Sequence, residues 1–332
     1  MKRTYSVLIA LFFLISGCGS DGSDPVAAPD PTLEITSNNA LLIANIAYSA
    51  ALESQQLGDS GGGVFIGSAS GGVTKIAGDL VSAAKTGTGN SGAQIPIPAE
   101  TIPCAVEGTM TISGEIADIV TPTLSAGDYF QYEYSGCDDG LGEVKNGTVR
   151  TDIDAFSGDL NTGLFSMTMT NTLTNFQVSI FENQSTTATE VVTSNGGATL
   201  TIDATSWPFL SYSVSGNSLV VDTLSSSESL VNFASTFTVD GNVVTSPYTH
   251  SSSGTLDSTQ LAGVIRYSNS VTFAGLGIDY PGSGEFLVEG LASSLRLFAE
   301  DNVNVRIEID LGADGTIDET INTTWTLLDA SQ

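Results

Sequence analysis

Two different periods of apolar residues divide this chain. Between residues 36 and 86, apolar side chains recur every three or four positions, which is the period of an amphipathic helix. They form two runs, Leu42, Ile46 and Ala50, then Val73, Ile76 and Leu80. A glycine-rich stretch separates the runs. The pattern predicts a helical hairpin over residues 36–86, and a linker over the Gly- and Pro-rich residues 87–103.

From residue 104 onward apolar residues recur every second position, as in strands with one solvent-exposed face. Apolar residues alternate with polar ones in runs such as Phe165, Met167 and Met169, or Val303, Val305, Ile307 and Ile309. Short pairs typical of hairpin turns interrupt the runs: Asn146-Gly147, Asn195-Gly196, Gly216-Asn217, Asp240-Gly241 and Asp314-Gly315. The sequence therefore predicts an antiparallel β domain over residues 104–332, with about 14 to 18 strands.

A sheet with so many strands must curve, close or split, because a flat sheet of this width would leave long exposed edges. The predicted fold class is mainly β, a large antiparallel curved sheet or barrel-like meander with a short N-terminal helical hairpin. We expect the hairpin to cover one open end or edge of the sheet. A barrel embedded in the outer membrane is disfavoured, because the polar face of each strand carries Ser, Thr and acidic residues.

The N-terminal residues have the features of an export signal. Lys2 and Arg3 precede a short apolar run of about nine residues, too short for a membrane-spanning helix, which needs roughly 20. Ile15-Ser16-Gly17-Cys18 then resembles the lipobox of bacterial lipoproteins, in which the cysteine is lipidated. The prediction is a signal peptide over residues 1–17, a lipidated Cys18, and a flexible tether over residues 18–35.

The strongly negative net charge of the chain argues against nucleic acid as a partner. The 332-residue chain has 37 acidic residues and a formal net charge of −28. Loss of Lys2 and Arg3 with the signal peptide would leave a charge of about −30. Such a surface repels nucleic acid, whose binding needs Lys and Arg contacts. Solubility in salty surroundings is the favoured interpretation, and cation binding is the alternative.

The cysteines suggest a disulfide. After Cys18 only Cys104 and Cys137 remain, and an exported chain with two cysteines most simply joins them. Free thiols or metal ligands are the alternatives. A single histidine and the absence of a CxxC motif leave little to build a thiolate–imidazole metal site.

One acidic segment resembles a calcium loop. Asp310, Asp314 and Asp318 occupy the first, fifth and ninth positions of a segment that resembles the DxDxDG loops of exported proteins, with Gly315 at the turn, and oxygen ligands suit a hard cation. The pattern departs at Gly312, where an acid is expected, and at Ile321, where an EF-hand has glutamate. A plain hairpin across the Asp314-Gly315 turn is the favoured interpretation, with Ca²⁺ as the alternative.

Other motifs point away from catalysis. Gly58-Asp59-Ser60-Gly61-Gly62 matches the string around the serine of trypsin-like proteases, but no histidine precedes it. The GxGxxG match at residues 87–92 lacks the strand before it and the helix after it that a dinucleotide site needs. The only histidine, His250, lies in a Ser- and Gly-rich stretch and is expected to be a solvated turn residue. No catalytic residue is predicted.

The whole chain resembles a loose group of uncharacterised outer-membrane lipoproteins of gammaproteobacterial type. The lipobox, the Cys104–Cys137 segment and the closing Thr323-Thr324-Trp325 carry this resemblance. Together with Gly19 after the cysteine, it implies anchoring at the outer membrane. The resemblance supplies no activity. The expected function is a non-catalytic structural or binding module whose partner is an envelope protein, a glycan or an apolar ligand. The alternatives are a carrier of an apolar ligand and a glycan-directed hydrolase.

Overall fold

The computed structural model describes residues 27–52 and 95–329, apart from short gaps at 118–123, 139, 141, 160–161, 182–186, 207, 242–244 and 278. Cys18 and the second half of the predicted helical hairpin lie outside the described residues. None of the described helices is long and apolar enough to cross a membrane.

Fourteen strands form one antiparallel sheet in which each strand pairs with its neighbours in sequence. They are β1 (Ile95–Pro103), β2 (Glu107–Ile116), β3 (Tyr129–Asp138), β4 (Glu143–Asp159), β5 (Leu164–Ile180), β6 (Glu190–Asp203), β7 (Phe209–Asp222), β8 (Ser227–Asp240), β9 (Pro247–Ser258), β10 (Gly263–Leu276), β11 (Ser283–Gly290), β12 (Ser293–Ala299), β13 (Asn304–Asp310) and β14 (Glu319–Thr324). The helix α3 (Trp325–Asp329) follows.

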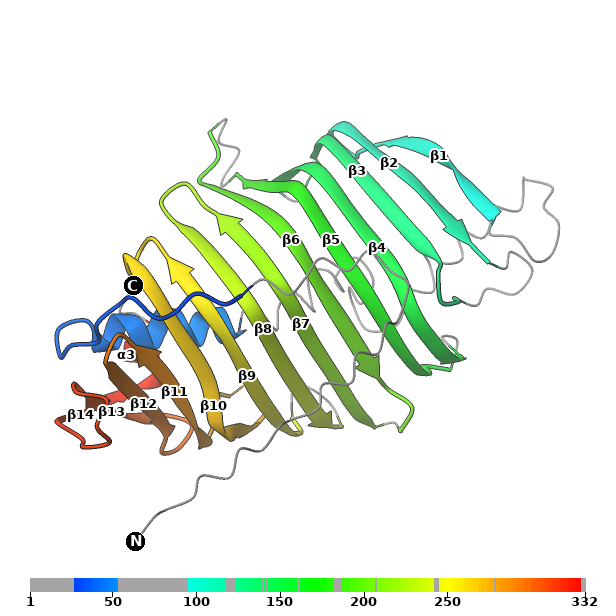
Figure 1. Ribbon diagram of the computed structural model, residues 1–332. Helices are drawn as coiled ribbons and strands as arrows, with labels where there is room; N and C mark the ends of the chain where they lie inside the picture. Colours follow the sequence, from blue (N-terminus) through cyan, green and yellow to red (C-terminus); the bar gives the residue numbers. More distant parts are fainter. Residues whose placement is uncertain are drawn as a thin grey trace, which may run out of the picture.

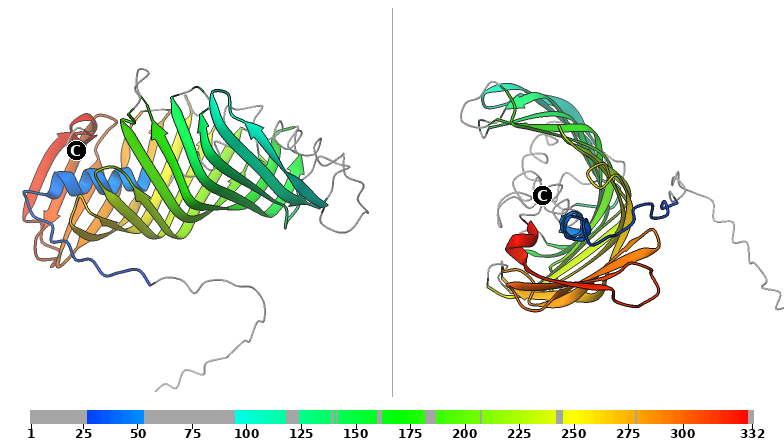
Figure 2. Two further views of the ribbon diagram at one scale, coloured as in Figure 1. Left: turned by 90° about the horizontal axis from the view of Figure 1, so that it is seen from above. Right: turned by 90° about the vertical axis from the view of Figure 1, so that its left-hand side faces the viewer.

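The sheet curves strongly but does not close, so β1 and β14 are its two edges (Figure 1). Viewed along its length, it has a C-shaped section with a concave and a convex face (Figure 2). The predicted fold class, a mainly β curved antiparallel meander, is confirmed. The sheet begins at Ile95, inside the stretch predicted to be a linker, because β1 pairs with β2 before Cys104 is reached.

A helix over residues 40–52 lies within the concave face, beside α3 (Figure 2). At its start the Thr36 N–H donates to Asn39 Oδ1 at 2.7 Å, one of the two bonds of a capping box. Its apolar side Ile43, Ala47 and Tyr48 is buried in the main core. The helical period predicted this element correctly.

Residues 30–35, predicted to belong to a flexible tether, are instead bound across the ends of β10 to β12. The Thr32 N–H donates to Val264 O at 3.0 Å, and the Leu291 N–H donates to Leu33 O at 2.7 Å. The Ile35 N–H donates to Ser293 Oγ at 2.8 Å. Leu33 and Ile35 give the segment apolar side chains that a solvated tether lacks, and Ile35 is fully buried.

Three of the predicted turns are wrong, because they lie inside strands. Asn146-Gly147, Asn195-Gly196 and Gly216-Asn217 fall within β4, β6 and β7, at or beside shifts of register. The positive φ that Asn-Gly supplies to a hairpin also suits a β-bulge, and bulges let long strands bend. Asp240-Gly241 and Asp314-Gly315 do follow the ends of β8 and β13.

Asparagine side chains fix two of these bulges. The Gly136 N–H donates to Asn146 Oδ1 at 2.8 Å, and the Asn175 N–H donates to Asn195 Oδ1 at 2.7 Å. Each bond satisfies a backbone donor that a bulge removes from the regular ladder. The bulges therefore form a bend line from strand to strand that helps to curve the sheet.

The predicted disulfide between Cys104 and Cys137 is confirmed, with a Cα–Cα distance of 5.4 Å. It joins the end of β1 to the end of β3. The first three strands are thereby linked covalently at one corner of the sheet.

Candidate functional site

The convex face of β5 to β9 is covered with hydroxyl groups, and we call it the hydroxyl face. Along each strand its residues alternate with buried ones, such as Met169, Leu200 and Val214. One row crosses five strands in register: Thr168, Thr201, Ser213, Thr236 and Ser251. A parallel row contains Thr170, Thr199 and Ser215. Strand geometry spaces such rows about 4.8 Å across the strands and about 6.7 Å along them.

A groove of about 540 Å³ interrupts this face where the bulges of β6 and β7 meet. It is lined by Thr170, Gly197, Ala198, Thr199, Ser215, Gly216, Asn217, Ser218, Asn232 and Phe233. The volume is in the range of small-ligand sites. Gly197, opposite Thr172 and Ser218, brings no side chain to the outward face, and Gly216 lets the backbone lie directly on the Phe233 ring below.

The floor of the groove is closely packed. A Cβ atom on Gly216 would lie 2.4 Å from Cζ of Phe233, so only glycine fits over that ring. Phe233 is almost completely buried in the core below. The groove therefore has a shape set by backbone and core rather than by mobile side chains.

Hydrogen bonds orient the hydroxyls at one wall. Thr170 Oγ1 donates to Asp154 Oδ2 at 2.7 Å, and Thr170 and Thr199 are joined by a 3.0 Å hydrogen bond. A carboxylate only accepts, so Thr170 uses its proton on Asp154, and Thr199 must donate to Thr170. The remaining lone pairs of Thr199 are then acceptors for a donor in the groove.

The chemistry of the lining suits recognition rather than proton transfer. Hydroxyl and amide groups of Thr, Ser and Asn donate and accept hydrogen bonds, and no residue of the described lining is ionisable. General acid–base catalysis requires a titratable group within hydrogen-bond reach. The groove therefore fits an uncharged, polyhydroxylated molecule.

The acidic segment proposed for calcium forms the β13–β14 hairpin. The Asp310 carboxylate accepts from the N–H groups of Gly312, Asp314 and Gly315 at 3.1, 3.2 and 2.7 Å. Asp318 accepts from the Leu311 N–H at 2.8 Å. Burial raises the pKa of Asp310, but these backbone hydrogen bonds outweigh it and hold the pKa below its ordinary value.

Asp314 also accepts a backbone bond, from the Thr316 N–H at 2.8 Å. All three predicted calcium ligands, Asp310, Asp314 and Asp318, thus stabilise the turn itself. Within the described part of the chain, no three His, Cys, Asp or Glu side chains gather as a metal-binding group. The geometry supports the hairpin interpretation and gives the Ca²⁺ alternative no support.

His250 is not a solvated turn residue, and that prediction is wrong. It lies within β9 and is only 3% exposed. Its Nε2 lies 3.1 Å from Ser235 Oγ on β8, and burial lowers its pKa to about 4. In β9 the buried residues Tyr248, His250 and Ser252 alternate with more exposed ones, as expected of a strand. The many serines of this segment made that alternation hard to recognise in the sequence. Among the described residues no carboxylate is bonded to His250, so this Ser–His pair lacks the orienting group of a catalytic triad.

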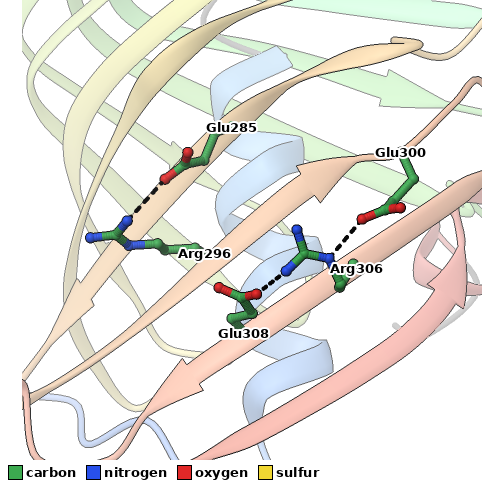
Figure 3. Close-up of polar contacts among 5 residues, drawn as sticks. All are labelled: Glu285, Arg296, Glu300, Arg306 and Glu308. Atoms are coloured by element: carbon green, nitrogen blue, oxygen red, sulfur yellow. Dashed lines mark hydrogen bonds and ion pairs between the residues drawn. The ribbon is translucent and has the colours of Figure 1, made fainter. Parts of the chain in front are cut away.

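A charged network marks the convex face of β11 to β13 (Figure 3). Arg296 pairs with Glu285 at 3.3 Å, and Arg306 pairs with Glu300 at 2.6 Å and also with Glu308. The Arg306 guanidinium also lies over the Phe298 ring, 4.1 Å from its centroid. Charges here are paired, and exposed pairs contribute little stability. This region contrasts with the neutral hydroxyl face beside it.

Comparisons of the chain with protein-family models, curated proteins and solved structures find no match. The resemblance to outer-membrane lipoproteins therefore stays a prediction.

Proposed function

We propose that this protein is a non-catalytic binding module of the cell envelope, held at the outer membrane by a lipid on Cys18, which binds a neutral glycan. The groove on the hydroxyl face carries the proposal. It combines a ligand-sized volume of about 540 Å³ with a lining of hydroxyl and amide groups.

The charge distribution favours a neutral ligand. The chain has a formal charge of −28, which repels anionic polymers at a distance. Thr199 offers acceptors, and the amide of Asn217 offers both donors and acceptors. Sugar hydroxyls both donate and accept, so they complement this set without an ionic contact.

The N-terminal segment limits how far the module reaches from a membrane. The first described side-chain contact with the sheet is the 2.8 Å ion pair of Asp30 with Arg266. Asp30 lies twelve positions after Cys18, and an extended chain of that length spans at most about 40 Å. A lipid on Cys18 would therefore keep the domain close to the surface, where envelope glycans lie. The disulfide suits an oxidising, exported location.

Calorimetric titration of the purified protein against neutral and acidic polysaccharides tests the proposal. Thr199→Val keeps the side-chain shape and leaves Thr170 bonded to Asp154, so it removes only the groove hydroxyl. We expect binding of a neutral polysaccharide to weaken about two- to tenfold, the effect of losing one hydrogen bond. The matched control is Thr236→Val, which lies on the same face outside the groove lining and should bind like wild type.

Three results would overturn the proposal: binding of no neutral polysaccharide, equal affinities for wild type and Thr199→Val, or release of reducing ends. The last would indicate the glycan-directed hydrolase. Native mass spectrometry of the same sample adds a direct comparison with the carrier alternative, because a retained lipid-sized mass would favour the apolar-ligand carrier instead.

A further inference from the structure

A second cavity lies on the concave side of the sheet, between the helix over residues 40–52 and the ends of β7 to β10. It has a volume of about 150 Å³, and its lining includes Ile46, Ser49, Val221, Glu228 and Gln260. We call it the Glu228 pocket. Sites for drug-sized ligands are larger, about 300–1,000 Å³, so the Glu228 pocket suits a small molecule.

Glu228 places a carboxylate on the core side of the sheet. It lies two residues before Leu230, which belongs to the main core, and residues two apart on a strand share a face. Ser258 on β9 lies opposite and donates to Glu228 Oε1 in a long hydrogen bond of 3.5 Å. Burial raises the pKa of Glu228 above its ordinary value, and this hydrogen bond offsets the effect only in part.

No basic side chain of the described residues neutralises this carboxylate. The Lys and Arg residues in the described part of the chain all pair with other acids: Lys145 with Glu143, Arg150 with Asp152, Arg266 with Asp30, Arg296 with Glu285, and Arg306 with Glu300 and Glu308. A carboxylate that is partly removed from water and lacks a counter-charge is costly. The pocket therefore favours a ligand that carries positive charge.

The rest of the lining indicates which kind of cation fits. The Ser49 hydroxyl and the Gln260 side-chain amide have no hydrogen-bond partner among the described residues, so their oxygens are open to a donor. A primary ammonium group has three N–H donors and no acceptor, which matches these oxygens and the carboxylate. Ile46 and Val221 add apolar surface. One carboxylate balances one positive charge, so a monovalent ammonium suits the pocket better than Ca²⁺.

We propose that the Glu228 pocket binds a primary ammonium group on a short alkyl chain. The ammonium donates to Glu228, Ser49 and Gln260, and the alkyl chain lies against Ile46 and Val221. A free amine and the lysine side chain of a peptide share this chemistry. The site is separate from the glycan groove, which lies on the hydroxyl face.

Saturation-transfer NMR of the purified protein tests the site with n-butylamine, and with n-butanol as an uncharged ligand of similar shape. We expect butylamine to bind and butanol not to bind, because only the ammonium forms charge-assisted hydrogen bonds. Glu228→Gln keeps the side-chain shape and should weaken butylamine binding at least about tenfold, the effect of losing a hydrogen bond between charged groups.

A control is needed because a chain with a formal charge of −28 attracts amines to many of its acids. Glu133→Gln makes the same charge change at an exposed position on β3 and should bind butylamine like wild type. Thermal unfolding checks the fold: Glu228→Gln should be at least as stable as wild type without ligand, because it removes a carboxylate that has no counter-charge.

Nα-acetyl-lysine amide distinguishes the two sources of the ammonium. Binding of this compound as well as butylamine extends the site to lysine side chains, and binding of butylamine alone restricts it to free amines; either result supports an ammonium site. The inference is overturned if neither amine binds, if butylamine and butanol bind alike, or if Glu228→Gln binds butylamine as strongly as wild type. None of these results bears on glycan binding, because the groove and the Glu228 pocket lie on opposite faces of the sheet.

Discussion

The two halves of the sheet are stabilised by different means. Strands shorten from 17 residues in β4 and β5 to six in β14. Strands β8 to β14 surround the helix over residues 40–52 and α3 (Figures 1 and 2). Strands β1 to β7 carry the disulfide and the two asparagine-fixed bulges described above. One continuous sheet thus combines an aromatic core at one end with covalent and backbone constraints at the other.

The aromatic core of the second half joins three separate parts of the sequence. Tyr48 on the helix lies 4.9 Å from the Trp325 ring and 5.7 Å from the Phe273 ring, measured between centroids. Tyr280 stacks on Trp325 at 5.4 Å, and Trp325 Nε1 donates to Asp301 O at 3.2 Å. Packing of this kind depends on shape, so it is sensitive to the loss of one ring.

The largest effect should follow removal of the central ring. Trp325→Ala should lower the free energy of unfolding by about 3–5 kcal/mol, since Trp325 is fully buried. Leu327 in the same short helix is 63% exposed, and Leu327→Ala should change stability by less than about 0.5 kcal/mol. Urea unfolding followed by circular dichroism measures both. Similar effects of the two variants would show that α3 does not contribute as part of this core.

Removing the disulfide tests the other half. The double variant Cys104→Ser, Cys137→Ser should lose roughly 3–4 kcal/mol in the chain-entropy model of a 33-residue separation. Hydrogen exchange should show faster opening of β1 to β3, while β11 to β13 keep their protection. Uniform loss of protection across all strands would contradict the division into two halves.

Acid should weaken the second half through His250. Its pKa is about 4 in the folded protein, below the ordinary value of 6.5, so the proton binds more tightly after unfolding. Stability is therefore full above pH 6.5 and falls as the pH drops toward 4, by about 3 kcal/mol at most. His250→Gln keeps a hydrogen-bonding side chain and should remove this loss. Equal pH profiles for wild type and variant between pH 7 and 4.5 would refute it.

A smaller effect is expected at the bend line. Asn195→Ala removes the acceptor of the Asn175 N–H and should destabilise by about 1–2 kcal/mol. Thr236→Val on the hydroxyl face serves as the reference and should be nearly neutral. If Asn195→Ala were equally neutral, the bulge would be maintained by the backbone alone.

How far the sequence predicts this molecule depends on whether a feature is local. The alternation around Met167 and Met169 and the helical period around Ile46 are local patterns, and both elements form as expected. Asn195-Gly196 has the same local chemistry in a turn and in a bulge, so its place inside a 14-residue strand was missed. His250 was missed because serine-rich strands look like loops.

The groove could not be predicted in the same way. Thr170 and Thr199 are 29 residues apart, and they meet only because the register of β5 with β6 places them opposite each other. Register arises from the pairing of whole strands, and a slip of β6 by one residue would turn the Thr199 hydroxyl into the core. The glycines that hollow the groove are visible in the sequence, but their adjacency is not.

The bound segment at residues 30–35 has a mechanical consequence. A pull on the N-terminus enters the fold at β10 to β12, through the hydrogen bonds of Thr32, Leu33 and Ile35. The load therefore falls on the end of the sheet that holds the aromatic core, while the groove on β5 to β8 lies off the line of force. If the chain is held at Cys18, as proposed, tension on it would leave the proposed binding groove undeformed.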